Sequence, residues 1–317
     1  MKFAGIIAEY DPFHNGHAWQ LAQAKALGAE RVAVAMSCSL VQRGALPLLP
    51  EAVRTRSALI CGADLVFALP APCACAGAEA FARAGVALLA AAGCDGLVFG
   101  AETPDAALLM EAAELLDSGS YRAALKAQLA GGARSFAAAR QAAAAQLASD
   151  ERVAALLDKP NNNLAVEYCR AIRSLAPRME AYPLPRQGAN HGEALHSAHG
   201  QFASASALRK LWAEGGADAV APYVPEAVFP LYQEAYAAGQ YTDFSAAGRC
   251  ELALLRSACR GKAPFADIRG VSEGLEHRLE AAVRTSTTYD ELLDALTTVR
   301  YPRARMRRLA MDAALGC

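Results

Sequence analysis

Short apolar runs alternate with stretches of helical spacing over the first hundred residues, and no other feature constrains the fold of this chain as strongly. Four largely apolar runs, at 3–8, 31–36, 64–69 and 96–100, predict strands, and the first is apolar throughout, as expected of a strand buried on both faces of a sheet. Strands that alternate with helices form parallel sheets with crossover connections, and ligands bind beyond the carboxyl ends of such strands. The expected crossover helices lie at 18–26, 51–61 and 76–92.

Beyond the fourth run the pattern becomes mainly helical. The Ala-rich stretch 104–158 favours long helices, because alanine has the highest helix propensity. Residues 160–163 (PNNN) predict a turn and an N-cap before an amphipathic helix over 164–175. Residues 181–184 (AYPL) are typical of an edge strand, since proline removes a donor from the hydrogen-bond ladder.

The last third of the chain is also predicted to be mainly helical. A helix follows Ser204 and extends to about Trp212, residues 223–225 (YVP) interrupt the pattern, and the remainder is mostly helical. We therefore expect an α/β fold in which an N-terminal domain over 1–215 holds a Rossmann-like parallel sheet. This domain includes a helical insert at about 104–158, and a mainly helical C-terminal domain follows over 216–317.

Composition narrows the class of protein. With 54% hydrophobic residues and a formal net charge of −1, the chain can bury a large core, and its overall charge does not attract nucleic acid. No apolar run reaches the roughly 18 residues of a membrane-spanning helix, and residues 1–8 are too short for a signal peptide, so we expect a cytoplasmic protein. The nine cysteines show no Cys-x-x-Cys spacing, which favours reduced, mostly buried thiols.

The first apolar run leads into a histidine pair, in the stretch GIIAEYDPFHNGH over residues 5–17. Three interpretations are open. A metal site needs a third ligand, and the other histidines lie far away in the sequence, at 191, 196, 199 and 277. His14 and His17 could also simply begin a helix, with Asn15-Gly16 as its turn. The third interpretation is a phosphate site at a helix N-terminus.

The phosphate interpretation accounts for the whole context of the pair. The glycine between the histidines lets a phosphate approach the backbone, and the helix N-terminus supplies N–H donors and a positive dipole. Two imidazoles bind the negative charge that develops on a phosphoryl group. This arrangement suits nucleotidyl transfer, and it differs from a P-loop or a Gly-x-Gly-x-x-Gly turn, neither of which follows a suitable strand here.

A strand followed by His-x-Gly-His resembles the first signature of the nucleotidylyltransferase superfamily. The second signature is a Ser/Thr-rich turn that ends in Ile-Arg and opens a later helix, and residues 203–209 (ASASALR) are similar to it. The resemblance is closer still to the family of bacterial tRNA(Met) cytidine acetate ligases, whose opening EYNPFHNGH is similar to EYDPFHNGH at 9–17. Further similar stretches extend over nearly the whole chain, at 41–44, 63–66, 99–102, 160–162, 167–168, 186–189 with His191, 273–276 and 300–301.

The resemblance implies a HIGH-type nucleotidyltransferase domain and a ligase. Such an enzyme uses ATP with Mg²⁺ to adenylate acetate, releases pyrophosphate, and passes the acetyl group to N4 of the wobble cytidine of elongator tRNA(Met). From the lack of a long apolar run we expect no membrane partner, and no obligate protein partner is evident in the sequence.

The resemblance also implies the residues of the site. His14 and His17 would act catalytically against the phosphates, while Ser204, Ser206 and Arg209 would hold the β and γ phosphates. The complete set expected to bind ATP is Ile7, Ala8, Glu9, Tyr10, Asp11, Pro12, Phe13, His14, Asn15, Gly16, His17, Ala18, Trp19, Gln20, Gly100, Asn161, Asn162, Arg186, Gln187, Ser204, Ser206 and Arg209.

Two alternatives to a tRNA ligase stay open. The chain has Cys38-Ser39, Pro50-Glu51 and Ala68 where the family has Gly-Asn, Asp-Lys and Glu. A glutamate in place of a lysine near a phosphate site reverses a charge, which favours a relative that binds nucleotide or RNA without catalysis. The other alternative is a small-molecule adenylyltransferase of the same superfamily, which would not need the helical C-terminal part.

Other polar residues are weaker candidates. His191, His196 and His199 fall in a loop-like stretch and are better explained as solvated histidines than as a metal cluster. Asp64 and Glu79 could serve as general bases, but carboxylates at strand and helix ends are usually caps or solvated groups.

Five arginines crowd residues 300–308, near the end of the chain. On a helix, Arg300, Arg303 and Arg307 would share one face. A solvated helix with ion-pair partners explains this run, but a nearly neutral protein that binds tRNA needs a local basic surface. We therefore expect these three arginines to contact RNA.

Overall fold

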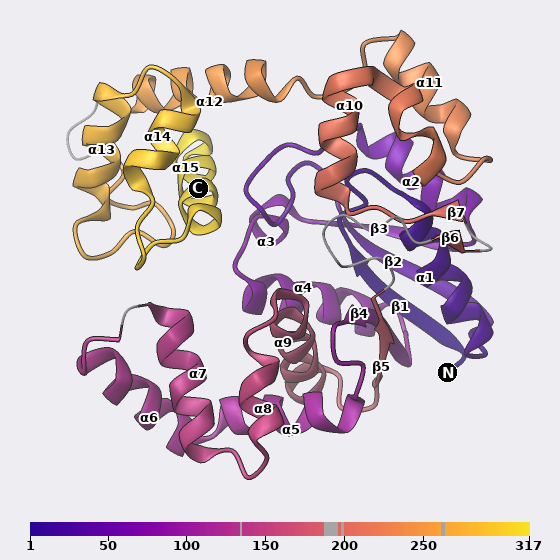
Figure 1. Ribbon diagram of the computed structural model, residues 1–317, viewed down its shortest axis with the longest axis horizontal. Helices are drawn as coiled ribbons and strands as arrows, with labels where there is room; N and C mark the ends of the chain where they lie inside the picture. The colour runs from indigo at the N-terminus through magenta and orange to yellow at the C-terminus, as the bar shows by residue number, and fades with distance from the viewer. Residues whose placement is uncertain (134, 187–195, 198–199, 261–263) are drawn as a thin grey trace.

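The computed structural model describes residues 1–133, 135–186, 196–197, 200–260 and 264–317. A parallel sheet forms the centre of the N-terminal part, on the right of Figure 1. Its strands are β1 (Phe3–Ala8), β2 (Arg31–Ser37), β3 (Leu65–Leu69), β4 (Gly96–Ala101) and β5 (Glu180–Pro185), in the order β3-β2-β1-β4-β5. All four neighbouring pairs are parallel, which confirms the predicted α/β fold.

The order of the strands reverses at one point. From β1 the chain builds outward through β2 to β3, and then returns to place β4 on the other side of β1. A crevice for ligands opens at the carboxyl ends of the strands where such a sheet changes direction. The loops that follow β1 and β4 are therefore the expected walls of a site.

Alternate residues of the strands face the two covered sides of the sheet. Ile6 and Val34 belong to a core with α1 (Asn15–Ala26), α2 (Glu51–Ile60), α10 (Ala205–Val220) and α11 (Phe229–Ala237). Ile7 and Ala35 belong to a second core with α4 (Ala78–Ala91) and α9 (Pro160–Leu175). The run at 64–69 forms the predicted strand, and Leu65 is 46% exposed because β3 lies at the edge of the sheet.

The Ala-rich stretch is helical, as predicted. It forms α5 (Ala106–Asp117), α6 (Gly119–Ala130), α7 (Phe136–Leu147) and α8 (Glu151–Leu156), and the pair α6–α7 extends away from the sheet at the lower left of Figure 1. The two remaining short strands, β6 (His196–Ser197) and β7 (Gly200–Gln201), pair antiparallel before α10.

The C-terminal helices form a body with a core of its own. These helices are α12 (Phe244–Ala258), α13 (Leu275–Thr285), α14 (Tyr289–Leu296) and α15 (Arg303–Leu315), and they pack around Leu255, Leu279, Leu292 and Met306. In Figure 1 they lie at the upper left, with α15 beside the short helix α3 (Ala71–Ala74) of the N-terminal part. We use "C-terminal body" for residues 244–317.

The boundary expected after residue 215 falls inside α10. That helix continues to Val220 through a kink at Gly216, and the core that it shares with the sheet extends to Ala235 of α11. A 3-10 turn (Ala221–Tyr223) separates α10 from α11, where the sequence predicted a break. We therefore propose a domain boundary near residues 238–243, between the two cores.

Three element starts differ from the predictions for local reasons. α1 begins at Asn15 instead of Ala18, because the His14 side chain caps it. α9 begins at Pro160, a residue favoured in the first helical position, so the three asparagines lie in its first turn and not before it. Arg300 precedes α15, so the prediction that it shares a helical face with Arg303 and Arg307 was wrong.

Among the described residues, no helix combines the length and the apolar character that crossing a membrane requires. All nine cysteines are free, and five of them are buried, as predicted from their spacing.

Candidate active site

The histidine pair forms the start of α1. His14 is the N-cap: its Nδ1 accepts a hydrogen bond from the backbone N–H of Gly16 at 3.0 Å. In return, Nδ1 of His17 accepts from the backbone N–H of His14 at 3.3 Å. The two rings stack with centroids 3.8 Å apart. A Cβ at Gly16 would lie 2.9 Å from the His14 ring, so a glycine is needed where the sequence has one.

These hydrogen bonds determine which nitrogen of each neutral imidazole carries the proton. Because each Nδ1 accepts a hydrogen bond, each neutral imidazole carries its proton on Nε2. Burial is the main cause that lowers the pKa of His14 to about 3, assisted by the positive charges of Arg186 and Arg209. Burial and the neighbouring His14 also lower the pKa of His17. At neutral pH the pair therefore offers two uncharged N–H donors.

A cavity of about 250 Å³ opens beside the histidines at the carboxyl ends of β1 and β4. We call it the histidine pocket. Its apolar walls come mainly from β4, α9 and β5, and its polar groups come from the start of α1, from α9 and from Arg186 after β5. The lining residues are Ile7, Ala8, His14, Gly16, His17, Trp19, Gln20, Phe99, Gly100, Asn161, Leu164, Tyr168, Leu184, Pro185, Arg186 and Ala205.

The two neighbouring asparagines have different surroundings. Asn161 lines the histidine pocket, where its Oδ1 accepts from Arg186 and its Nδ2 donates to Glu102 at 2.6 Å. Asn162 is buried, and its amide is used by the backbone N–H and the hydroxyl of Thr103. Glu102 also accepts from the backbone N–H of Asn162 at 2.7 Å. Asn161 therefore faces the pocket, and Asn162 fixes the start of α9.

Buried charged side chains fix the position of the loop between β1 and α1. The Asp11 carboxylate is 1% exposed and accepts from Arg43 and from the backbone N–H of Leu48 at 2.5 Å. Arg209 of α10 donates to the Asp11 carbonyl oxygen at 2.5 Å. Burial is the main cause that lowers the pKa of Arg209 to about 10, with the nearby Arg43 as the second cause. Two cations are thereby gathered behind the histidine loop.

Arg54 of α2 is a functional neighbour that the sequence did not reveal. It is fully buried, and within the described residues its guanidinium pairs with no carboxylate. It donates to the carbonyl oxygens of Glu9 at 2.8 Å, Ser37 at 2.6 Å and Leu49 at 2.9 Å, and also to that of Cys38. Arg54 therefore joins the ends of β1 and β2 beneath the site.

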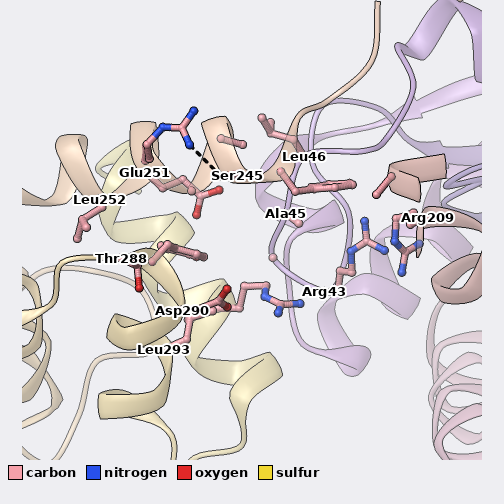
Figure 2. A pocket seen from close by; sticks show the side chains of 18 of the residues that line it. Arg43, Ala45, Leu46, Arg209, Ser245, Glu251, Leu252, Thr288, Asp290 and Leu293 are labelled. Carbon is pink, nitrogen blue, oxygen red and sulfur yellow. Dashed lines mark hydrogen bonds between the residues drawn. The ribbon is translucent and has the colours of Figure 1, made fainter. Parts of the chain in front are cut away.

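The start of α10 lies between the histidine pocket and a second, larger cavity. Ser204 caps α10 by accepting from the backbone N–H of Ala207 at 3.2 Å, and its hydroxyl lies 3.0 Å from that of Ser206. Ala205 lines the histidine pocket, whereas Ser206 and Arg209 line the second cavity. That cavity measures about 690 Å³ and lies between the N-terminal part and the C-terminal body, as Figure 2 shows. We call it the basic cavity.

The predicted ATP residues are thus distributed over three environments. Ten of them line the histidine pocket: Ile7, Ala8, His14, Gly16, His17, Trp19, Gln20, Gly100, Asn161 and Arg186. Glu9, Tyr10, Asp11, Pro12, Phe13, Asn15, Ala18 and Asn162 lie behind or beside it, and Ser204, Ser206 and Arg209 form the start of α10. Gln187 lies outside the described residues.

The supporting residues have clear structural tasks. Glu9 accepts from the backbone N–H of Gln42 at 2.5 Å, and burial raises the pKa of its carboxyl against the opposing effect of Arg43. Tyr10 and Phe13 are fully buried and pack edge to face, with ring centroids 4.9 Å apart. Asn15 donates to the carbonyl oxygens of Gln201 at 3.0 Å and Pro222 at 3.2 Å.

The weaker candidates have other surroundings. Asp64 pairs with Lys25 at 2.7 Å, and Glu79 lies 3.7 Å from Arg170 in the first turn of α4, so neither carboxylate faces a site. His196 is in β6, and His191 and His199 lie outside the described residues. Among the expected RNA contacts, Arg300 pairs with Glu273 and Arg303 with Asp290, whereas Arg307 lines the basic cavity.

Comparison with known proteins identifies the family to which this chain belongs. The model of the HIGH Nucleotidyl Transferase family matches residues 1–317. A tRNA(Met) cytidine acetate ligase from Syntrophotalea carbinolica is 36% identical over 98% of this chain and 73% of its own length, and one from Latilactobacillus sakei is 34% identical over 100% and 77%.

Solved structures agree with the sequence relatives. The crystal structure of apo Thermotoga maritima TmcAL superposes with a TM-score of 0.90 at 30% identity, covering 99% of this chain and 75% of that one. TmcAL bound with alpha-thio ATP superposes with a TM-score of 0.89 at 29% identity, covering 100% and 75%. This chain therefore belongs to the HIGH nucleotidyl transferase family and, within it, to the tRNA(Met) cytidine acetate ligases.

Proposed function

We propose that the chain activates acetate with ATP and acetylates N4 of the wobble cytidine of elongator tRNA(Met). The observation that carries this proposal is the placement of two neutral imidazoles beside the start of α10, at the carboxyl ends of β1 and β4, in a member of this family. The match to the ligases extends over the C-terminal body, which a small-molecule adenylyltransferase would not need.

Adenylation is the first half of the proposed reaction. An acetate oxygen bonds to the α-phosphorus of ATP while the bond from that phosphorus to the bridging oxygen breaks, and pyrophosphate leaves. The attacking and attacked groups are both anionic, so donors must surround the phosphoryl oxygens. We assign this task to Nε2–H of His14 and His17, with the serines and Arg209 at the start of α10 on the β and γ phosphates.

Transfer is the second half. The amino nitrogen of the cytidine bonds to the acetyl carbon, the bond from that carbon to the AMP oxygen breaks, and AMP leaves while the amine proton passes to solvent. We propose that ATP binds the predicted set of residues in the histidine pocket, with Asn161 and Arg186 on its rim.

Mg²⁺ enters the proposal only as a companion of ATP. The described residues contain no group of three or more histidines, cysteines or carboxylates that could hold a metal ion. The buried carboxylate of Asp11, in the loop before α1, already accepts from Arg43 and the backbone N–H of Leu48. The residues therefore do not fit a protein cage for Mg²⁺, which commonly binds through phosphate oxygens and water. We also propose a cytoplasmic location, where ATP and tRNA are available.

The test separates the two half-reactions. Acetate-dependent exchange of labelled pyrophosphate into ATP reports adenylation, and labelled acetate recovered on tRNA(Met) reports transfer. We expect His14→Asn to lower the exchange rate by about 10²–10³, because one oxyanion donor is lost. Asparagine is itself a good N-cap, so the start of α1 and the fold are retained.

The matched control is His277→Asn, which changes a histidine that is 81% exposed on α13. It is expected to behave like the unchanged protein. Exchange at the unchanged rate in both His14→Asn and His17→Ala would refute the roles given to the pair.

A further inference from the structure

The basic cavity is larger than the histidine pocket and belongs to two parts of the molecule. Arg43 and Arg209 reach it from the N-terminal part, and Glu251 and Asp290 reach it from the C-terminal body, as Figure 2 shows. Its wall holds five basic side chains and two carboxylates. This excess of positive charge favours an anionic ligand.

Several of these cations are not neutralised by the protein. In the part of the chain that the structure describes, Lys210 and Arg307 make no hydrogen bond or ion pair, and Arg249 donates only to the hydroxyl of Ser245 at 2.8 Å. Asp290, by contrast, pairs with Arg303 at 2.6 Å. The cavity therefore keeps free positive charge that phosphate groups can bind.

Two buried oxygens in the same wall lack hydrogen-bond partners. One is Oε2 of Glu251 and the other is the hydroxyl of Tyr289. Burial raises the pKa of both groups, and the adjacent Glu251 carboxylate, which interacts with the Tyr289 hydroxyl, raises that of Tyr289 further. A ligand with N–H donors would supply the hydrogen-bond partner that Oε2 of Glu251 lacks.

An exposed aromatic ring gives the cavity a surface on which a base can stack. Phe244, at the start of α12, is 38% exposed, and the Arg43 guanidinium lies 5.9 Å from its ring centroid. Exposed aromatic rings and arginine planes stack unpaired bases, and a glutamate accepts from the exocyclic amino group of a base. Phosphate, base plane and base edge therefore each have a matching group in one cavity.

We propose that the basic cavity binds one unstacked nucleotide of the RNA substrate, next to the nucleotide that is acetylated. Lys210 and Arg307 hold its phosphates, Phe244 stacks its base, and Glu251 accepts from its N–H groups. This proposal rests on the proposed function, which supplies the RNA. The position fits, because Ala205 lines the histidine pocket and the next residue, Ser206, lines the basic cavity.

Binding measurements test the cavity independently of catalysis. The probe is an RNA hairpin with the sequence of the anticodon arm of tRNA(Met), labelled for fluorescence anisotropy. We expect Lys210→Ala combined with Arg307→Ala to raise its Kd at least about 10-fold and to flatten the slope of log K against log salt by about 0.7 per cation removed. Acetate-dependent pyrophosphate exchange should stay at the unchanged rate. Arg56→Ala, at an exposed arginine of α2, is the matched control for loss of charge.

A crosslink distinguishes a nucleotide in the cavity from general attraction. With 4-thiouridine beside the target cytidine, we expect the crosslinked peptides to contain Phe244 or Tyr289. Unchanged Kd in the double variant, or crosslinks only outside the cavity, would overturn the proposal. Displacement of the hairpin by free CMP at equal concentration would also overturn it, in favour of a mononucleotide site. If the unchanged protein shows no exchange, the proposed function fails, and these binding results still decide the cavity.

Discussion

The histidine pocket and the basic cavity are built in opposite ways. Most polar groups of the histidine pocket come from one continuous stretch, residues 7–20, where a strand ends and a helix begins. The basic cavity collects single side chains from α10, α12, α14, α15 and the loop after β2. A site formed by one continuous segment leaves a recognisable motif in the sequence. A site made between two bodies exists only once both are folded and docked.

The loop over residues 38–48 connects the two regions. Gln42 bonds to Glu9 behind the histidine pocket, while Arg43 bonds to Asp11 and also lines the basic cavity. Beyond the loop, the C-terminal body docks through Met311, which packs against Leu40 and Cys75. Substitutions in this loop, and at Arg54 beneath the histidine pocket, therefore show which contacts each of the two regions requires.

The largest effect is expected at Arg54, beneath the histidine pocket. Arg54→Met removes donors from four carbonyl oxygens at the ends of β1 and β2, so the free energy of unfolding should fall by about 3–5 kcal/mol. Urea denaturation followed by circular dichroism measures it. Arg56→Met, two residues along the same helix and exposed, should stay within about 0.5 kcal/mol of the unchanged protein. Equal stability of the two variants would contradict the role of Arg54.

This arginine shows where prediction from the sequence ends. The sheet, its helices and the histidine signature follow from local patterns: apolar runs, helical spacing and a glycine between two histidines. Arg54 stands in a helix like many exposed arginines, and nothing near it in the sequence indicates that its guanidinium is buried. The carbonyl groups that bind it come from loops after two different strands.

Element boundaries failed for related reasons. Histidine is not among the preferred N-cap residues, so the start of α1 at Asn15 was missed by three residues. Neither could the sequence separate Asn161, which faces the histidine pocket, from its neighbour Asn162, which faces Thr103. The direction of each side chain depends on how α9 meets β4.

The second prediction concerns the contact between loop 38–48 and α15. Gly44 has φ +74°, and an added Cβ would lie 2.6 Å from the backbone nitrogen of Arg308. Gly44→Ala should therefore destabilise the protein by about 1–3 kcal/mol, and it should weaken RNA binding by displacing Arg307. Urea denaturation and anisotropy with the hairpin measure both effects.

Gly62→Ala provides the control for backbone strain. Gly62 has φ +105° and no heavy atom within 4 Å of an added Cβ, so only the cost of the backbone conformation remains. Unchanged RNA affinity is expected there. If Gly44→Ala also keeps the affinity of the unchanged protein, docking of α15 on this loop is not needed to form the basic cavity.

The smallest effect is the pH dependence that the histidine pocket imposes on stability. The pKa of His14 is about 3 in the folded protein, below the value of about 6.5 in an unfolded chain. The unfolded state therefore binds a proton that the folded state does not, so stability is complete above pH 6.5 and is lost as the pH falls towards 3. Between pH 6.5 and pH 5.5, the titration of His14 alone should lower the free energy of unfolding by about 1 kcal/mol.

His14→Asn removes this group and keeps the helix cap, so the difference in unfolding free energy between variant and unchanged protein should grow in favour of the variant across that interval. The exposed His277→Asn should show no such growth. A constant difference for His14→Asn would mean that the imidazole is protonated in the folded protein as readily as in the unfolded one, and the neutral donor assigned to His14 would then be charged in mild acid.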